Sequence, residues 1–338
     1  MSGKKLIKKI SIIAEIASAH NGSFSRLKKL INKSIEAKTD YLKFQIYKNK
    51  YLCHKTSKFY DGLKKIEISY EKWSKIINIY KNKVKIILEP FDEVSYLFCK
   101  KYKNFTDLKI SSSEQDNLYL IDDSLKNFKR VFFNISGKSK KELDYYLSRY
   151  NRYKKKLIFL YGYQSFPTKS ANLRFGVLKY IQQKGFKVGY ADHCATDTIL
   201  DTYIASLISI YHGAEYLEKH FTLDRLKKFP DYISSFEFDE FKNYINFFKF
   251  NMKNFNNLRL TDDEKNYTNE MGKYAVLIKD KFKNQLLKKD DIIFLRTGEK
   301  GLKRSDLFIG NKNKKIYFKK NYKTNQILNK NQFKLIKY

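Results

Sequence analysis

Two stretches decide how the rest of this chain is interpreted: Val188-Gly189-Tyr190-Ala191-Asp192-His193 and Ala214-Glu215-Tyr216-Leu217-Glu218-Lys219-His220-Phe221. Each is a short, largely apolar run with a histidine at or near its end, and the chain has only 5 histidines in 338 residues. A neutral imidazole is a good ligand for a divalent metal, so two of them at neighbouring strand ends would make half of a metal site. The alternative is two histidines that are buried separately and share no role.

Similar apolar runs recur through the N-terminal part of the chain and alternate with amphipathic stretches, such as 26–31, 70–80 and 200–211. The apolar runs suit strands buried on both faces, and the amphipathic stretches have helical spacing. Eight strands alternating with helices predict an α/β fold, a (β/α)₈ TIM barrel. An open doubly wound sheet is the alternative, but no Gly-x-Gly-x-x-Gly turn supports it. The predicted strands are 11–16, 41–46, 84–88, 107–110, 131–134, 157–161, 188–191 and 216–220.

The pattern changes in the last third of the chain. Residues 1–246 would form the barrel, and the Asn- and Lys-rich segment 247–268 is expected to be a linker. Beyond it, 274–278 and 291–295 alternate like short strands, so residues 269–338 are predicted to form a small all-β domain.

Charge and composition limit the classes of partner. The formal net charge is +34, but the basic residues are spread along the whole chain and no nucleic-acid motif is present, so we expect no nucleic-acid partner. No apolar run is long enough for a membrane span, and no signal-peptide pattern follows Met1. Three distant cysteines predict neither a disulfide framework nor structural zinc, and they fit a cytoplasmic protein.

Polar residues at the predicted strand ends would meet at one face of a barrel, where the active sites of this fold lie. Lys43 and Lys109 interrupt apolar strands, which is costly unless they are paired or functional. They would either form structural ion pairs with Glu15 or Glu114, or cradle a phosphate or carboxylate with help from the Ser112 hydroxyl. Glu15 and Glu114 are candidate acids or bases.

These residues lie in segments that resemble the sialic acid (N-acetylneuraminate) synthase family over nearly the whole chain. The region after the linker resembles that family's antifreeze-like (SAF, β-clip) domain, with Leu295-Arg296-Thr297-Gly298 in its substrate-facing loop. The matching barrel segments are 13–15, 20–22, 42–45, 90–92, 109–114, 189–193 and 217–225, followed by Pro230-Asp231.

The resemblance implies a C–C bond-forming transferase that condenses phosphoenolpyruvate with an N-acetylmannosamine-type sugar, giving a nonulosonic acid and phosphate. It also implies a domain-swapped homodimer, in which the loop of one subunit reaches the sugar in the other barrel. His193 and His220 would hold Mn²⁺ or Mg²⁺. The implied catalytic residues are Glu15 and Asp231, which would position the sugar, and Glu114, which would help to add water. The implied substrate-binding residues are Lys43, Lys109, Ser112, Gln164, Phe166 and Arg296.

Three departures from the family pattern fall where a hydroxyl is usual near the phosphate: Glu89, Ile135 and Ala191. Glu89 replaces the threonine of Ser-Thr-Pro-Phe, and a carboxylate beside a phosphate is repulsive. The sequence therefore predicts a divergent member with an altered donor, an altered sugar or lost activity. A related barrel aldolase or lyase with a different keto-acid donor, and a non-catalytic binding protein, are the alternatives.

Overall fold

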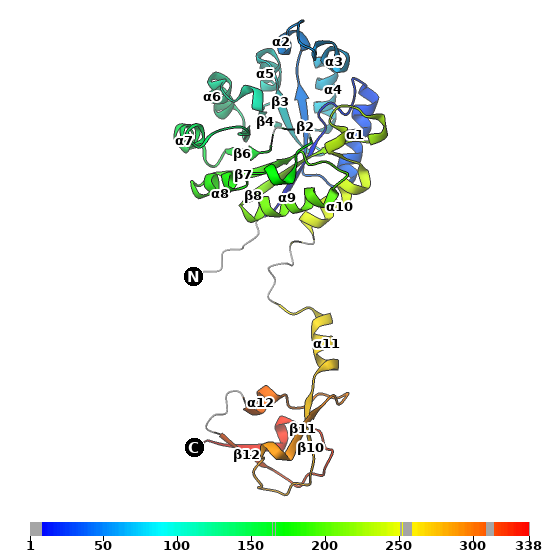
Figure 1. Cartoon of the computed structure of the whole chain (residues 1–338), viewed down its shortest axis with the longest axis vertical. Coiled ribbons are helices and arrows are strands. Elements are labelled where there is room, and N and C mark those ends of the chain that lie inside the picture. Colours follow the sequence, from blue (N-terminus) through cyan, green and yellow to red (C-terminus); the bar gives the residue numbers. More distant parts are fainter. Residues whose placement is uncertain are drawn as a thin grey trace. The chain divides into compact units, whose positions relative to one another are not determined.

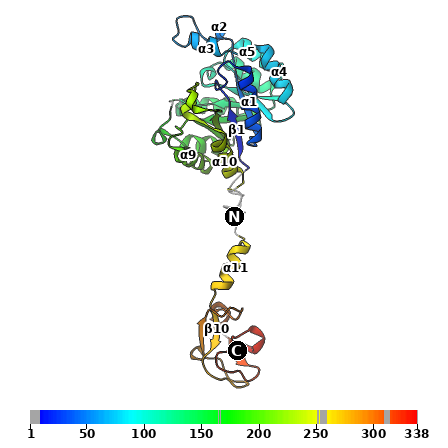
Figure 2. The same cartoon turned by 90° about the vertical axis from the view of Figure 1, so that its right-hand side faces the viewer.

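The computed structural model describes residues 9–163, 165, 167–250, 252, 259–308 and 314–337. The chain divides into two compact units, Met1–Asn256 and Asn257–Tyr338 (Figures 1 and 2). The three cysteines, Cys53, Cys99 and Cys194, form no disulfide. No helix in the described part of the chain is long and apolar enough to cross a membrane.

The first unit is a closed barrel of eight parallel strands. Each strand pairs with its neighbours in chain order, and β1 pairs with β8 to close the barrel (Figure 1). The predicted (β/α)₈ fold is thereby confirmed, and a two-residue strand, β9 (Ser235–Phe236), extends the sheet beyond β8. The strands are β1 (Ser11–Glu15), β2 (Tyr41–Ile46), β3 (Lys85–Pro90), β4 (Thr106–Ile110), β5 (Val131–Asn134), β6 (Leu157–Tyr161), β7 (Lys187–Asp192) and β8 (Ala214–Phe221).

Helices surround the strands and bury their apolar faces against them. Polar side chains fix where several helices begin: Ser23 accepts a hydrogen bond from the Arg26 amide at the start of α1, and Asp92 accepts one from the Ser95 amide at the start of α5. The helices of this unit are α1 (Phe24–Glu36), α2 (Asn49–Leu52), α3 (Tyr60–Ile66), α4 (Tyr70–Tyr80), α5 (Glu93–Lys100), α6 (Leu118–Asn127), α7 (Lys140–Arg149), α8 (Gly176–Gln183), α9 (Ile199–Tyr211) and α10 (Phe238–Lys249).

The inside of the barrel is filled by apolar side chains toward the amino-terminal ends of the strands. Tyr41, Phe132 and Tyr216 meet edge to face, with ring centroids 5.2 to 6.2 Å apart. A packed interior of this kind leaves the carboxyl ends of the strands as the place for a polar site. The interior cluster consists of Ile13, Tyr41, Ile87, Phe132, Ile158, Leu160 and Tyr216.

The second unit contains two antiparallel pairs of strands around its own small apolar core. β10 (Tyr274–Leu277) pairs with β11 (Ile292–Leu295), and β12 (Lys314–Phe318) pairs with β13 (Phe333–Lys337). Helices α11 (Asp262–Met271) and α12 (Arg304–Phe308) accompany them. Both ends of the predicted 247–268 linker are helical, because α10 continues to Lys249 and α11 begins at Asp262. The assignment of residues 269–338 as an SAF domain stays a prediction.

Candidate active site

Two lysines and three glutamates form a buried ionic cluster at the carboxyl ends of the barrel strands, called here the inner cluster. Each of the five side chains is at most 4% exposed. Lys43 Nζ forms an ion pair with Glu15 and lies 2.8 Å from Glu89 Oε2 and 2.9 Å from Glu218 Oε1. Lys109 Nζ lies 2.7 Å from the same Glu218 oxygen and 3.4 Å from Glu89 Oε1.

The inner cluster has one more acidic group than it has basic groups. Burial raises the pKa of Glu15 to about 8; Lys43 opposes this rise, while Glu218 and Glu89 add to it. Burial also acts to raise the pKa of Glu218, but Lys109 and Lys43 outweigh it and hold that pKa well below the usual range. Glu15 therefore takes up a proton more readily than Glu218, whose charge the two lysines stabilise. Among the described residues, Glu89 Oε2 and Glu218 Oε2 are buried without a hydrogen bond, although Glu89 Oε2 keeps its ion-pair contact with Lys43.

The two histidines lie together beside the inner cluster. His193 directly follows β7 and His220 lies in β8, and their ring centroids are 5.4 Å apart. Burial lowers the pKa of each to about 3, with His220 adding to the shift of His193 and Lys43 adding to that of His220. Both imidazoles are therefore neutral. Glu15 is the β1 partner of His220 in the strand register, which places the histidines next to the inner cluster.

Two neutral imidazoles suit a divalent metal as nitrogen donors. His193 Nδ1 lies 3.2 Å from the Tyr163 carbonyl oxygen, and an Nδ1–H donated there puts the ring lone pair on Nε2. Asp231 Oδ2 lies 4.0 Å from His220 Nδ1. Within the described part of the chain, no group of three or more His, Cys, Asp or Glu residues is arranged to hold a metal ion. The pair fits a metal whose other positions are filled by water or substrate oxygens, as in a catalytic site.

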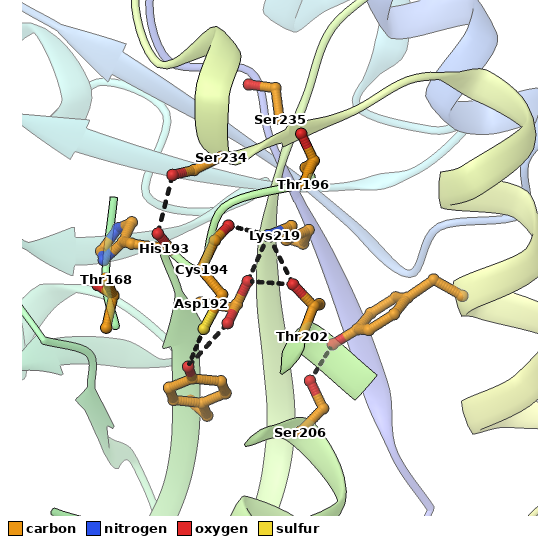
Figure 3. Close-up of polar contacts among 12 residues, drawn as sticks. Thr168, Asp192, His193, Cys194, Thr196, Thr202, Ser206, Lys219, Ser234 and Ser235 are labelled. Atoms are coloured by element: carbon orange, nitrogen blue, oxygen red, sulfur yellow. Dashed lines mark hydrogen bonds and ion pairs between the residues drawn. The ribbon is translucent and has the colours of Figure 1, made fainter. Parts of the chain in front are cut away.

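A second buried ion pair, called here the outer pair, joins the residues that precede the two histidines. Because side chains alternate along a strand, Asp192 and Lys219 point away from the barrel interior when His193 and His220 point into it. Lys219 forms an ion pair with Asp192 and donates to the Cys194 carbonyl at 3.1 Å and to Thr202 Oγ at 3.2 Å (Figure 3). Thr202, on α9, donates in turn to Asp192. The outer pair thus ties β7, β8 and α9 together directly behind the histidines.

Asp231 reaches the site from the loop after β8. Its backbone is left-handed, with a φ of 65°, and its side chain is only partly exposed. Burial raises its pKa, and His193 and Lys43 oppose that rise, so this carboxyl faces both the histidines and the inner cluster. The loop is anchored by Ser234, whose hydroxyl donates to the His193 carbonyl at 2.8 Å (Figure 3). A non-glycine residue held in this conformation is common at functional sites.

Comparisons with known proteins identify the family of this chain. A family model described as the NeuB family matches residues 30–255. The chain belongs to the NeuB family. It is 26% identical over 253 residues to the pseudaminic acid synthase of Campylobacter jejuni, covering 70% of this chain and 71% of that protein. It is 24% identical over 319 residues to the N,N'-diacetyllegionaminic acid synthase of Legionella pneumophila, covering 85% of each.

A solved structure shares the fold. It is the N-acetylneuraminic acid (sialic acid) synthetase of Leptospira borgpetersenii in complex with citrate, with a TM-score of 0.65 and 22% identity over 78% of this chain and 93% of that one. The resemblance to the sialic acid synthase family that the sequence motifs indicated is confirmed by the NeuB family match.

The structure brings together six of the residues expected from the NeuB-type motifs. Glu15, Lys43 and Lys109 lie in the inner cluster, and His193, His220 and Asp231 lie beside it. Lys43 does form an ion pair with Glu15, whereas Lys109 pairs with Glu89 and Glu218, and Glu114 is a partner of neither lysine. Sequence reasoning missed Glu218, which contacts both lysines. A signal was present, since Glu218 is a charged residue two positions before His220 in an apolar strand and therefore shares its face.

Of the other expected residues in the described part of the barrel, Ser112 and Glu114 form no ion pair with the inner cluster. Ser112 and Glu114 follow β4 in a short 3₁₀ turn (Ser112–Glu114), and Glu114 accepts a hydrogen bond from Asn117 at 3.0 Å. Arg296 follows β11 in the second unit, so its role in the barrel of another subunit stays a prediction. Gln164 and Phe166 lie outside the described residues.

Proposed function

We propose that this NeuB-family protein is a metal-dependent synthase that condenses phosphoenolpyruvate with an N-acetylmannosamine-type sugar. The products would be a nonulosonic acid and inorganic phosphate. The observation that carries the proposal is the position of a buried lysine pair next to a pair of neutral histidines at the carboxyl end of one barrel. Family membership favours this reaction over the related aldolase or lyase that the sequence also allowed.

The donor would bind at Lys43 and Lys109. Both ammonium groups are almost fully buried, and charge-assisted hydrogen bonds to phosphate or carboxylate oxygens are strongest where water is excluded. Ser112 would add a hydroxyl donor from the end of β4. The anion would exchange with carboxylates that already neutralise the lysines, so binding replaces one set of ion pairs by another.

The sugar would bind on the histidine side. A Mn²⁺ or Mg²⁺ ion held by His193 and His220 would polarise the carbonyl of the open-chain sugar. Glu15 and Asp231, whose pKa values burial raises, would exchange hydrogen bonds with the sugar hydroxyls. Glu114 would orient the water that adds to the donor. In the proposed dimer, Arg296 of the SAF domain would contact the N-acyl group, and the protein would act in the cytoplasm.

An assay of coupled products tests this function. Purified chain is incubated with Mn²⁺, phosphoenolpyruvate and a panel of N-acetylated amino sugars, and phosphate and 2-keto acid are measured together. We expect the two products in equal amounts with at least one sugar, and their loss in His193→Ala. The matched control is His212→Ala, because His212 caps the C-terminal end of α9, away from the site. Phosphate release that is independent of sugar, or turnover unaffected by His193→Ala, would overturn the proposal.

A further inference from the structure

Glu89 is placed between the two lysines of the inner cluster. Its strand, β3, lies between β2 and β4, which carry Lys43 and Lys109. Its two carboxylate oxygens contact different lysines, at 2.8 Å and 3.4 Å, whereas Glu218 contacts both through a single oxygen. The Glu89 side chain is 4% exposed. Any anion that binds to this lysine pair must therefore come within contact distance of the Glu89 carboxylate.

Two anionic groups cannot stay close together in a buried site unless one of them holds a proton. The groups that face Glu89 are Lys43 from β2, Lys109 from β4, Glu15 from β1 and Glu218 from β8. With Glu89 itself, three of the five side chains in the cluster are already acidic. An ionised carboxylate can only accept hydrogen bonds. The ligand that fits beside it is therefore an anion that brings its own O–H donor.

A phosphate monoester can supply that donor. Its second pKa is about 6, so a singly protonated phosphate group remains accessible near neutral pH. Its P–O–H group can donate to Glu89 while its other oxygens accept from the two lysines. A sulfate or sulfonate group has the same shape but carries no proton under these conditions, so it would leave the Glu89 carboxylate facing bare negative oxygens.

We propose that Glu89 is a specificity-determining residue that accepts a hydrogen bond from a singly protonated phosphate group of the donor. This inference rests on the proposed function, in that it places a phosphorylated donor at the lysine pair. Threonine, usual in the family at this position, could donate to a fully ionised phosphate. With Glu89 in place of threonine, the pocket would select the singly protonated form of the phosphate group, and phosphate would remain its ligand.

Competition between phosphate and sulfate tests the proposal. Binding of inorganic phosphate, sulfate and phosphoenolpyruvate to the full-length chain is measured calorimetrically between pH 6.5 and 8.5, for the wild type, Glu89→Gln and Glu89→Thr. The wild type should bind phosphate at least about tenfold more tightly than sulfate, and its affinity for phosphoenolpyruvate should fall by up to about tenfold per pH unit as the proton is lost. Both variants should bind the two ions nearly equally and lose most of this pH dependence. The control is Glu36→Gln, an exposed carboxylate paired with Lys33, which should match the wild type.

The outcomes separate this inference from the proposed function. If the wild type binds phosphoenolpyruvate but shows the same phosphate-to-sulfate ratio as Glu89→Gln, the role of Glu89 is wrong and the donor site stands. If neither the wild type nor either variant, all shown to be folded, binds phosphate or phosphoenolpyruvate at any pH, the donor site itself is wrong. Binding of these anions by the Glu89 variants alone also contradicts the inference, since Glu89 would then exclude phosphate instead of selecting it.

Discussion

The inner cluster and the outer pair are both buried ionic groups built on the same end of the barrel, yet their composition differs. In the outer pair, one carboxylate meets one ammonium, and Thr202 and the Cys194 carbonyl complete the hydrogen bonding of Lys219. In the inner cluster, two ammonium groups meet three carboxylates, and two carboxylate oxygens lack a hydrogen-bond partner among the described residues. A complete pair fixes a structure, whereas an excess of carboxylates around two lysines leaves groups that can exchange for a ligand.

One strand contributes to both groups. Along β8, Glu218 and His220 face the barrel interior and Lys219 faces α9. The same three-residue run therefore carries site residues on one side and the supporting ion pair on the other. We therefore expect substitutions in the outer pair to lower stability and substitutions on the inner face to change binding and activity.

Breaking the outer pair should have the largest effect. Lys219→Met leaves Asp192 buried without its partner, and losses of this kind destabilise proteins by about 3 to 5 kcal/mol. Chemical denaturation measures the change in the free energy of unfolding. The double variant Asp192→Asn with Lys219→Met should recover part of the loss.

On the inner face, Glu89→Gln should shift stability by less than about 1 kcal/mol, since it removes one of three crowded carboxylates. Equal losses of unfolding free energy in Lys219→Met and Glu89→Gln would contradict the difference proposed between the outer pair and the inner cluster.

Removing a histidine should affect function more than stability. His220→Ala should lower turnover by roughly 10³-fold, or about 4 kcal/mol of transition-state stabilisation, if the histidines hold a metal that polarises the sugar carbonyl. Electron paramagnetic resonance gives a readout that does not depend on turnover, because free Mn²⁺ has a sharp signal that broadens on binding. At fixed total Mn²⁺, the free-ion signal should rise in the same variant. Unchanged Mn²⁺ affinity would show that the metal is held elsewhere.

The inner cluster and the outer pair should also differ in how they make stability depend on pH. The pKa of Glu15 is raised from 4.5 to about 8, so between these values the folded state holds a proton that the unfolded state has lost. The contribution of Glu15 to the free energy of unfolding should therefore fall as pH rises through this window, by at most about 1.4 kcal/mol per pH unit; below about pH 6.5 the buried histidines, whose pKa values are lowered, act in the opposite direction. Lys219 holds the pKa of Asp192 below its ordinary 3.8 despite burial, so the outer pair adds no slope here.

Glu15→Gln isolates the effect of this one carboxyl. Denaturation curves are compared for the wild type and the variant in metal-free buffer between pH 6.5 and 8, a range above the ordinary pKa of the buried histidines. The difference in unfolding free energy between the two proteins should change steadily across this range. Parallel pH profiles would mean that Glu15 is already ionised in the folded state.

The smallest effect is expected at the edge of the outer pair. Thr202→Val keeps the shape of the side chain but removes the hydroxyl that accepts from Lys219 and donates to Asp192. A hydrogen bond of this kind contributes about 1 kcal/mol, and thermal or chemical unfolding can resolve the change. Affinity for Mn²⁺ should be unaltered. A drop in Mn²⁺ affinity larger than the drop in stability would show that the outer pair also tunes the histidines.

The barrel could be predicted from the sequence because strands buried on both faces leave an apolar run that periodicity detects. All eight predicted strands match observed strands to within two residues at each end, including the two that lead to His193 and His220. The charged residues within those runs marked Lys43 and Lys109 as exceptional. Family motifs then gave the remaining candidates that the structure places beside them.

The partners of those lysines could not be assigned in the same way. Glu218 lies on β8, far from Lys43 and Lys109 in the sequence, and only closure of the barrel brings it to them. Glu89 lies on the strand between theirs, but its contacts depend on the register and on the face that it takes. The pairing of Asp192 with Lys219 likewise depends on which face each residue takes. The linker was placed by composition, which does not show that α10 extends into it and that α11 begins within it.

A crystal structure of the full-length chain with Mn²⁺ and phosphoenolpyruvate tests the central claim most directly. The account predicts Mn²⁺ within about 2.3 Å of one ring nitrogen on each of His193 and His220. It also predicts donor oxygens within about 3 Å of both Lys43 Nζ and Lys109 Nζ, with Glu89 in hydrogen-bond contact with the phosphate group. The account would be contradicted by Mn²⁺ bound away from the histidines. It would also be contradicted if the donor bound elsewhere and the five ion pairs of the inner cluster remained intact.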